Sequence, residues 1–251
     1  MDSMTLSQNL SDPIQLLGMS YYFDPGTAAR SGDFGLNVFE YYGLGRGGVL
    51  GGADEQAVYD AFRFFHRNAI AFLYTSPSAK ADPVAIAVEH VQSAYAFADR
   101  TFGGVDRADL ARFAELSAKV ISGVPEGLYP LVDGYRRLGP DANPVHAAYY
   151  ATILLRELRG GVHIACTDEV GLAAEAACYL QNEGIFKMHG YGDADVPADP
   201  ESYRPKKEAA EVRTSEVMAG YFDVLTDAER DDIARITATM NEALGSPVAV
   251  S

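Results

Sequence analysis

Signals that begin helices recur along this chain, and they constrain its fold more than any other feature. An Asp or Asn directly precedes a Pro at Asp12-Pro13, Asp24-Pro25, Asp82-Pro83 and Asn143-Pro144. The first side chain caps free helix amides, and Pro fits the first turn because its missing N–H is not needed there. Roughly eight to ten helices fit between these starts and the following stops, with little strand signal. The sequence therefore predicts an all-α protein built as a multi-helix bundle.

Composition and turn residues suggest how the chain divides. With 251 residues and 48% hydrophobic content, it can bury a sizeable core. We expect residues 1–183 to form a helical core domain. Gly, Pro and Asp crowd residues 184–205, which predicts a loop or lid there, with 185–188 as a candidate short strand. A capping box at 226–229 opens the last helix, so residues 206–251 are predicted to pack on the core as a helical hairpin.

The charge of the chain bears on its partners and location. A net charge of −15 repels phosphate backbones and anionic membrane surfaces. The best basic run, Arg204-Pro205-Lys206-Lys207, is followed at once by Glu208. We therefore do not expect nucleic acid as a partner. There is no signal peptide and no apolar run of membrane-spanning length, and Cys166 and Cys178 fit reduced, buried thiols. We expect a cytoplasmic protein that does not enter a membrane.

The segment 143–163 concentrates the chemistry of the chain. It begins as a capped helix and is predicted to end near Gly160. Around that helix, polar and aromatic side chains gather on one side: His146, Tyr149, Tyr150, Arg156 and Glu157. His146 and Glu157 lie about 16 Å apart along the axis, too far for direct contact. A bend at Gly160-Gly161 would return His163 toward Glu157, whereas a straight helix would leave His163 on the side of Arg156.

This arrangement predicts a pocket between helices. Arg156 would hold an anionic group, while His163, Glu157 and His146 would transfer protons. Tyr149 and Tyr150 would line the pocket. The favoured function is a small-molecule-binding protein and probable enzyme of isomerase or lyase type, without a metal. The cofactor is left unknown, and a homo-oligomer is left open. The alternative is structural, since buried ion pairs and a hydrogen-bonded core histidine produce the same pattern.

Two further motifs have competing interpretations. Gly43, Gly45 and Gly48 match the spacing G-x-G-x-x-G, but a dinucleotide site would need a preceding strand. The surroundings look helical, so we expect a tight connection on which another helix packs. A lesser alternative is an anion-binding nest that includes Arg46. His189 lies in the segment 188–193, which is either a ligand-binding loop or, preferably, a polar surface turn.

The central segment also resembles a known family. Val145-His146-Ala147-Ala148 and residues 154–165 are similar to the "HAA…LREHRGDGHVAAL" signature of an actinobacterial all-helical family that is catalogued as helix-turn-helix-like. The similarity extends through most of residues 10–180. It implies a helical portion followed by a winged-helix-like region, here in degenerate form, and it supports a second function, a ligand-responsive transcriptional regulator. The first His and the Asp of the signature are absent from residues 157–163, and no basic recognition helix is evident.

Overall fold

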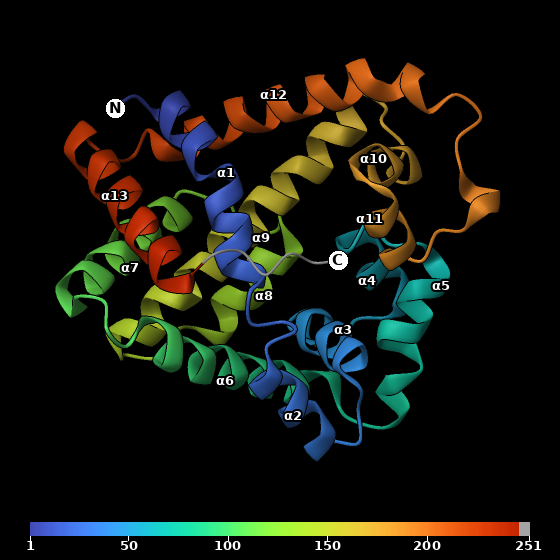
Figure 1. The fold of residues 1–251 in the computed structure, drawn as a ribbon, viewed down its shortest axis with the longest axis horizontal. Helices are drawn as coiled ribbons and strands as arrows, with labels where there is room; N and C mark the ends of the chain where they lie inside the picture. The colour runs from blue at the N-terminus through green and yellow to red at the C-terminus, as the bar shows by residue number, and fades with distance from the viewer. Residues whose placement is uncertain (246–251) are drawn as a thin grey trace.

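The fold consists of helices joined by short connections (Figure 1). The structure is a computed structural model, and it describes residues 1–245. Residues 246–251, the end of the predicted 206–251 region, lie outside the described residues. Thirteen α-helices occur in residues 1–245: α1 Ser3–Met19, α2 Pro25–Asp33, α3 Val38–Gly48, α4 Glu55–Ala61, α5 Arg67–Ile70, α6 Pro83–Phe102, α7 Arg107–Ser122, α8 Pro130–Leu138, α9 Pro144–Glu169, α10 Ala174–Gln181, α11 Glu183–Met188, α12 Arg204–Phe222 and α13 Asp227–Leu244. No β-strand occurs within this range, so the predicted all-α bundle is confirmed.

Helix α9 is the longest element and runs through the centre of the bundle, in contact with α1, α6, α7, α8 and α12. The side chain of Asn143 caps its first turn, as predicted. The helix does not end or bend at Gly160-Gly161 but continues to Glu169. Gly161 lies against the ring of Tyr129, where an added Cβ would come within 2.6 Å of a ring carbon. The helix end predicted near Gly160 was wrong, because Gly161 serves close packing with Tyr129 inside a continuous helix.

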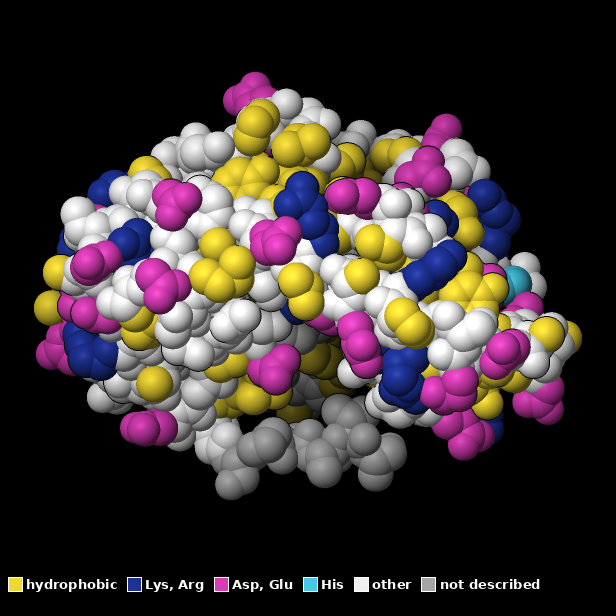
Figure 2. Space-filling model, turned by 90° about the horizontal axis from the view of Figure 1, so that it is seen from above, with side chains coloured by type: hydrophobic (Ala, Val, Ile, Leu, Met, Phe, Trp, Pro, Cys, Tyr) yellow, Lys and Arg dark blue, Asp and Glu magenta, His cyan; other side chains and the backbone are white. Residues whose placement is uncertain are grey.

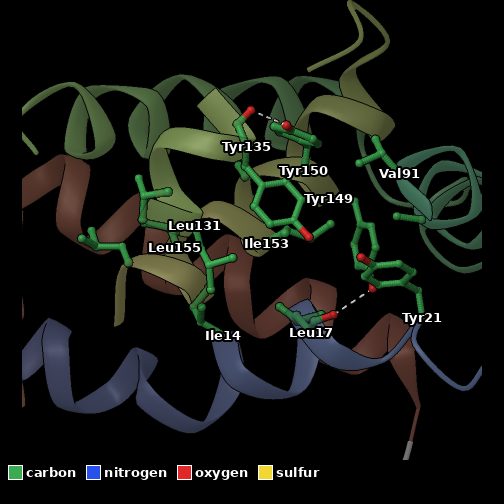
Figure 3. Packing of buried hydrophobic residues seen from close by; sticks show 14 of the residues in the cluster. Ile14, Leu17, Tyr21, Val91, Leu131, Tyr135, Tyr149, Tyr150, Ile153 and Leu155 are labelled. Carbon is green, nitrogen blue, oxygen red and sulfur yellow. Dashed lines mark hydrogen bonds between the residues drawn. The ribbon is translucent and has the colours of Figure 1, made fainter. Parts of the chain in front are cut away.

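Both sides of α9 are buried, so the side predicted to line a pocket is packed core (Figure 3). Tyr149 and Tyr150 are completely buried. Their hydroxyls donate to backbone carbonyls, that of Leu17 at 2.9 Å and that of Tyr135 at 2.5 Å. A buried phenol needs such a partner, and these bonds satisfy both hydroxyls. The two tyrosines therefore join α9 to α1 and α8 inside the packed core.

The glycine-rich motif lies inside helix α3 and is neither a loop nor a connection. Gly43 approaches the carbonyl of Leu73, and Gly48 approaches the carbonyl of Pro83 at the start of α6. An added Cβ at these positions would lie 2.1 and 1.9 Å from those oxygens. The glycines thus let two neighbouring segments pack directly on the α3 backbone. Neither a dinucleotide loop nor an anion-binding nest forms, because the α3 amides belong to a helix.

Backbone hydrogen bonds and a capping residue set the bounds of the helices in two places. Residues 53–74 do not form one helix but divide into α4, α5 and a π-helical turn at Ala71–Thr75. The backbone amide of His66 donates to His189 O at 2.8 Å, so it is not available to continue a helix. Helix α1 begins at Ser3 with Asp2 as its cap, and Pro13 lies within it. Asp12-Pro13 therefore does not begin a helix, because about two and a half turns of α1 already precede this pair.

The C-terminal helices cover the core from two sides. Helix α12 runs along the top of Figure 1 and packs on α1 and α9, while α13 packs on α1 and α7. The predicted loop 184–205 contains most of α11 and two short 3₁₀ turns, Asp193–Asp195 and Pro200–Tyr203. The candidate strand 185–188 is therefore helical, and within residues 1–245 no strand-built wing follows it. None of the described helices combines the length and apolar character needed to cross a membrane.

Candidate functional site

The strongest concentration of buried charge lies between α3 and α9. Arg46 donates from Nε and Nη2 to the two carboxylate oxygens of Glu157, at 2.9 and 2.8 Å. Arg156 donates from Nη1 to Glu157 Oε1 at 2.7 Å. The Glu157 side chain is only 1% exposed and the Arg46 side chain 9%. We call these three residues the Arg46–Glu157–Arg156 cluster. Three of the residues predicted from the sequence therefore come together, although Arg46 is 111 residues from Glu157.

Aromatic side chains enclose this cluster. The Tyr22 hydroxyl accepts a hydrogen bond from Arg156 Nη1 at 3.0 Å, and the Tyr42 hydroxyl accepts one from Arg46 Nη1 at 3.3 Å. The Arg46 guanidinium also lies 4.4 Å from the ring centroid of Phe62, a cation–π distance. Tyr22, Tyr42 and Phe62 were not among the site residues predicted from the sequence. The only indication in the sequence was that tyrosines occur in adjacent pairs at 21–22 and 41–42. Helical periodicity places such tyrosines in a hydrophobic core as readily as in a binding site.

The charges of the cluster do not cancel. Burial alone raises the pKa of the Glu157 carboxyl, but Arg46 and Arg156 outweigh burial and hold this pKa below its usual value. Burial disfavours the charged Arg46 guanidinium, and Glu157 restores it by raising its pKa. Burial also raises the pKa of the Tyr22 hydroxyl, which remains neutral at pH 7. Two positive charges therefore face one negative charge in the protein interior.

His90 of α6 lies beside the cluster and is completely buried. Its Nδ1 is 3.1 Å from the Tyr21 hydroxyl, and its ring packs directly on Gly45. Burial, followed by the positive charge of Arg46, lowers the pKa of His90 to about 3. The imidazole is therefore neutral at pH 7. His90 was not predicted from the sequence, because a lone histidine on an apolar helix has no distinctive spacing from other polar residues.

The lowered pKa of His90 predicts a loss of stability in mild acid. In the unfolded chain this histidine gains a proton near pH 6.5, whereas in the folded chain it does so only near pH 3. The contribution of neutral His90 to the free energy of unfolding is therefore fully present above pH 6.5. It is lost as the pH falls below this value, by at most about 1.4 kcal/mol per pH unit. Urea unfolding from pH 7.5 to 4.5 should show this slope, and His90→Phe should reduce it. An equal slope in both proteins would contradict this role for His90.

His146 lies away from the cluster. Its Nε2 is 3.1 Å from Asp99 Oδ1 and its Nδ1 is 3.3 Å from Asp141 Oδ2. The imidazole stacks on the ring of Tyr95 with centroids 4.5 Å apart. These contacts join the start of α9 to α6 and to the loop after α8. His146 and Glu157 do not meet, as the helical geometry of the sequence predicts.

Of the other two predicted histidines, His163 contacts α12 and His189 contacts α10. His163 Nδ1 is 2.9 Å from the Thr214 hydroxyl of α12. That hydroxyl donates its hydrogen to Ala210 O, so His163 donates to the hydroxyl. His189 Nδ1 is 3.2 Å from the Cys178 sulfur. Burial raises the pKa of the Cys178 thiol to about 12 and lowers that of His189 to about 4, so neither is charged at neutral pH. His163 therefore does not converge with Glu157, because α9 is unbroken.

Within the part of the chain that the structure describes, the candidate site residues coincide with neither a metal-ligand group nor the surface hollow beside α6. Among residues 1–245, no group of three or more His, Cys, Asp and Glu side chains is arranged to hold a metal ion. A surface hollow of about 210 Å³ lies between α6 and the loop after α8. Tyr95, Pro140 and Asp141 contribute to its lining, which includes none of the residues predicted to bind or transform a ligand.

Helices α10 and α11 form a compact helix–turn–helix pair. Only Asn182 separates them, in an extended backbone conformation, and its side chain accepts from the Ile185 amide at 2.8 Å. Cys178, Phe186 and Tyr191 form a small core beneath the two helices. Both cysteines of the chain are free and buried, as predicted. This pair occupies the region where the sequence resemblance placed a winged-helix-like unit.

Comparison with known proteins identifies the family of the chain. A profile described as a helix-turn-helix family matches residues 7–195, which include α10 and α11. No curated protein and no solved structure matches the chain. The family match overturns two predictions made from the sequence: the small-molecule enzyme, and the exclusion of nucleic acid as a partner. The prediction that excluded nucleic acid rested on the net charge of the chain. It was wrong because net charge averages over the whole surface. Since the profile covers about three quarters of the residues, the chain belongs to this helix-turn-helix family.

Proposed function

We propose that this protein is a DNA-binding transcriptional regulator, with α10 and α11 as its DNA-contacting unit. The family match over residues 7–195 carries the proposal. Helix-turn-helix proteins place the second helix of the pair in the major groove. Here that helix is α11, which is packed on one side and presents Gly184, Lys187 and Met188 to solvent. The side chains of Lys187 and Met188 would contact the base edges, with Gly184 allowing a close approach of the backbone.

Lysines beside α10 provide candidate phosphate contacts. Lys207 Nζ donates to Leu180 O at 3.2 Å and to Gln181 Oε1 at 2.9 Å, at the C-terminal end of α10. Lys206 Nζ donates to Gly171 O at 2.9 Å, in the turn before α10. The basic run at 204–207 therefore lies against the helix pair. Phosphate contacts from such side chains would set the register of the protein on DNA.

Charge sets the conditions under which this binding should occur. Figure 2 shows Lys and Arg side chains interspersed with Asp and Glu over the face that carries α12. Lys187, for example, pairs with Glu183 at 2.6 Å on the exposed surface of α11. Exposed pairs of this kind contribute little, so phosphate can replace the carboxylate. With about four phosphate contacts, log K should fall with log salt at a slope of about −4.

The first experiment asks whether the protein selects DNA. Purified protein is incubated with fragmented genomic DNA of its own host at about 50 mM salt, and the bound fragments are sequenced. We expect a recurring site and a gel shift that weakens as salt rises. Failure to enrich any sequence, at low salt and with folded protein, would rule out sequence-specific DNA binding.

Lysine variants locate the DNA-binding surface. We expect Lys187→Gln combined with Lys207→Gln to weaken binding about tenfold or more and to make the salt slope shallower by about two. The matched control is Lys119→Gln on α7, whose exposed amine pairs with Glu229 far from the helix pair. The control should bind as the unchanged protein does in gel-shift titrations. Equal binding by all three proteins would move the DNA contact away from α10 and α11.

A further inference from the structure

The Arg46–Glu157–Arg156 cluster contains an uncompensated positive charge. The two guanidiniums share a single carboxylate. Burial raises the pKa of the Tyr22 hydroxyl, which is neutral, and both nearby imidazoles, His90 and His189, have their pKa values lowered by burial and by the charge of Arg46. A buried charge without a partner is costly, so proteins rarely keep one without a use for it. The imbalance is one unit, which a monoanion would neutralise.

Polar atoms at the cluster also lack partners. Within the described residues, Arg156 Nε, Tyr135 Oη and His90 Nε2 are buried and form no hydrogen bond. Buried polar groups are normally paired, and each exception calls for an explanation. The Arg156 side chain retains 13% exposure, whereas Glu157 beneath it retains 1%. Arg156 is therefore the member of the cluster that an incoming anion would meet first.

We propose that Arg46 and Arg156 bind a small organic carboxylate, which supplies the missing negative charge. A guanidinium offers a planar fork of N–H donors that matches a carboxylate. The buried side chains of Tyr22, Tyr42 and Phe62 contact the two arginines, so an organic carboxylate that reached the guanidiniums would lie among aromatic rings. A phosphate dianion fits less well, since it would reverse the imbalance and leave one excess negative charge among aromatic rings.

The site is connected to the helix–turn–helix pair by packed aromatic rings. The Arg46 guanidinium lies over Phe62, and Phe62 packs on Phe65 with ring centroids 5.8 Å apart. Phe65 packs on the imidazole of His189 at 4.3 Å, and His189 contacts Cys178 of α10. A carboxylate that moved Arg46 would therefore disturb contacts that hold α10 and α11. This regulatory role rests on the proposed DNA-binding function, but carboxylate binding does not.

Calorimetry on the free protein tests the binding site with two probes of the same shape. Benzoate is the probe, and benzamide is its neutral counterpart, both at constant ionic strength set with sodium chloride. We expect benzoate to bind and benzamide not to bind. Binding of both with equal affinity would overturn the proposal, because the site would then be selecting a ring and not a charge. Failure of folded protein to bind benzoate would overturn it as well.

Substitutions at Glu157 and Arg156 are expected to change the affinity for benzoate in opposite directions. Glu157→Gln removes the competing carboxylate and should tighten benzoate binding about tenfold or more. Arg156→Lys keeps the charge, loses the planar fork and should weaken binding about tenfold. The control Arg159→Lys lies one turn further along α9 and pairs with Glu211 of α12, so it should leave binding unchanged. Weaker benzoate binding by folded Glu157→Gln protein would contradict the charge argument.

Gel shifts with and without benzoate separate the two proposals. A shift that benzoate changes in the unmodified protein, but not in a variant that no longer binds benzoate, supports a regulatory site. If benzoate binds and the shift is unchanged, the effector role is overturned while the binding site stands. If no DNA shifts even without benzoate, the proposed function fails independently of the carboxylate site.

Discussion

Gly48→Ala is expected to abolish folding of this protein, and Gly43→Ala to do nearly the same. The added methyl groups would lie 1.9 Å from Pro83 O and 2.1 Å from Leu73 O, far inside contact distance. Both obstacles are backbone atoms, so no side-chain rotation relieves them. The segments that carry these carbonyls would have to move away from α3. We expect a loss of about 4 kcal/mol or more, which lies at the extreme of single substitutions.

Gly160→Ala is the matched control for these substitutions. Gly160 is also helical, and an added Cβ there would meet nothing within 4 Å. Alanine should therefore stabilise α9 by about 0.5–1 kcal/mol through its higher helix propensity. Circular dichroism and urea unfolding of the three variants measure both effects. If Gly48→Ala and Gly160→Ala protein proved equally stable, the close approach of α6 to α3 would be wrong.

Glu157→Ala should be the most damaging change in the buried charge cluster. It leaves Arg46 and Arg156 facing each other in the core without a counter-charge. Removing one partner of a buried ion pair costs about 3–5 kcal/mol. We expect a loss of this size in urea unfolding at neutral pH. A cost below about 1 kcal/mol would mean that water already reaches these groups.

A triple variant separates charge from packing in the same cluster. Arg46→Met, Glu157→Leu and Arg156→Met together remove all three charges and keep similar apolar volume. Replacing a whole buried ionic group in this way is often neutral or stabilising. The triple variant should therefore recover at least half of the stability that Glu157→Ala loses. A triple variant no more stable than Glu157→Ala protein would show that packing around these side chains, and not charge, determines the loss.

Local signals in the sequence predicted much of the fold. Asp24, Asp82 and Asn143 each precede a Pro and accept hydrogen bonds from the first helix amides, as expected. These contacts span two or three residues, so neighbouring sequence is enough to specify them. Asp12-Pro13 shows the limit of this argument, because a helix that had already begun at Ser3 continues through it.

The site was only partly predictable for a related reason. Arg156 and Glu157 were found because both lie on one recognisable helix. Tyr22 and His90 were missed, since they join the cluster through packing across distant parts of the chain. Contacts between residues on distant segments cannot be read from the periodicity of a single helix. Whether His163 would meet Glu157 depended on the course of the helix after Gly160, and in the structure α9 continues unbroken to Glu169.

The sequence by itself determined that this protein is helical, where most helices begin, and that ionisable groups concentrate on α9. Those properties depend on residues within one or two helical turns of each other. The tertiary structure alone decided that α9 is enclosed on both sides, and that the glycines of α3 serve close helix packing. It also decided that Arg46 shares Glu157 with Arg156. The physical reason is that burial and charge pairing depend on which distant segments meet in the folded chain.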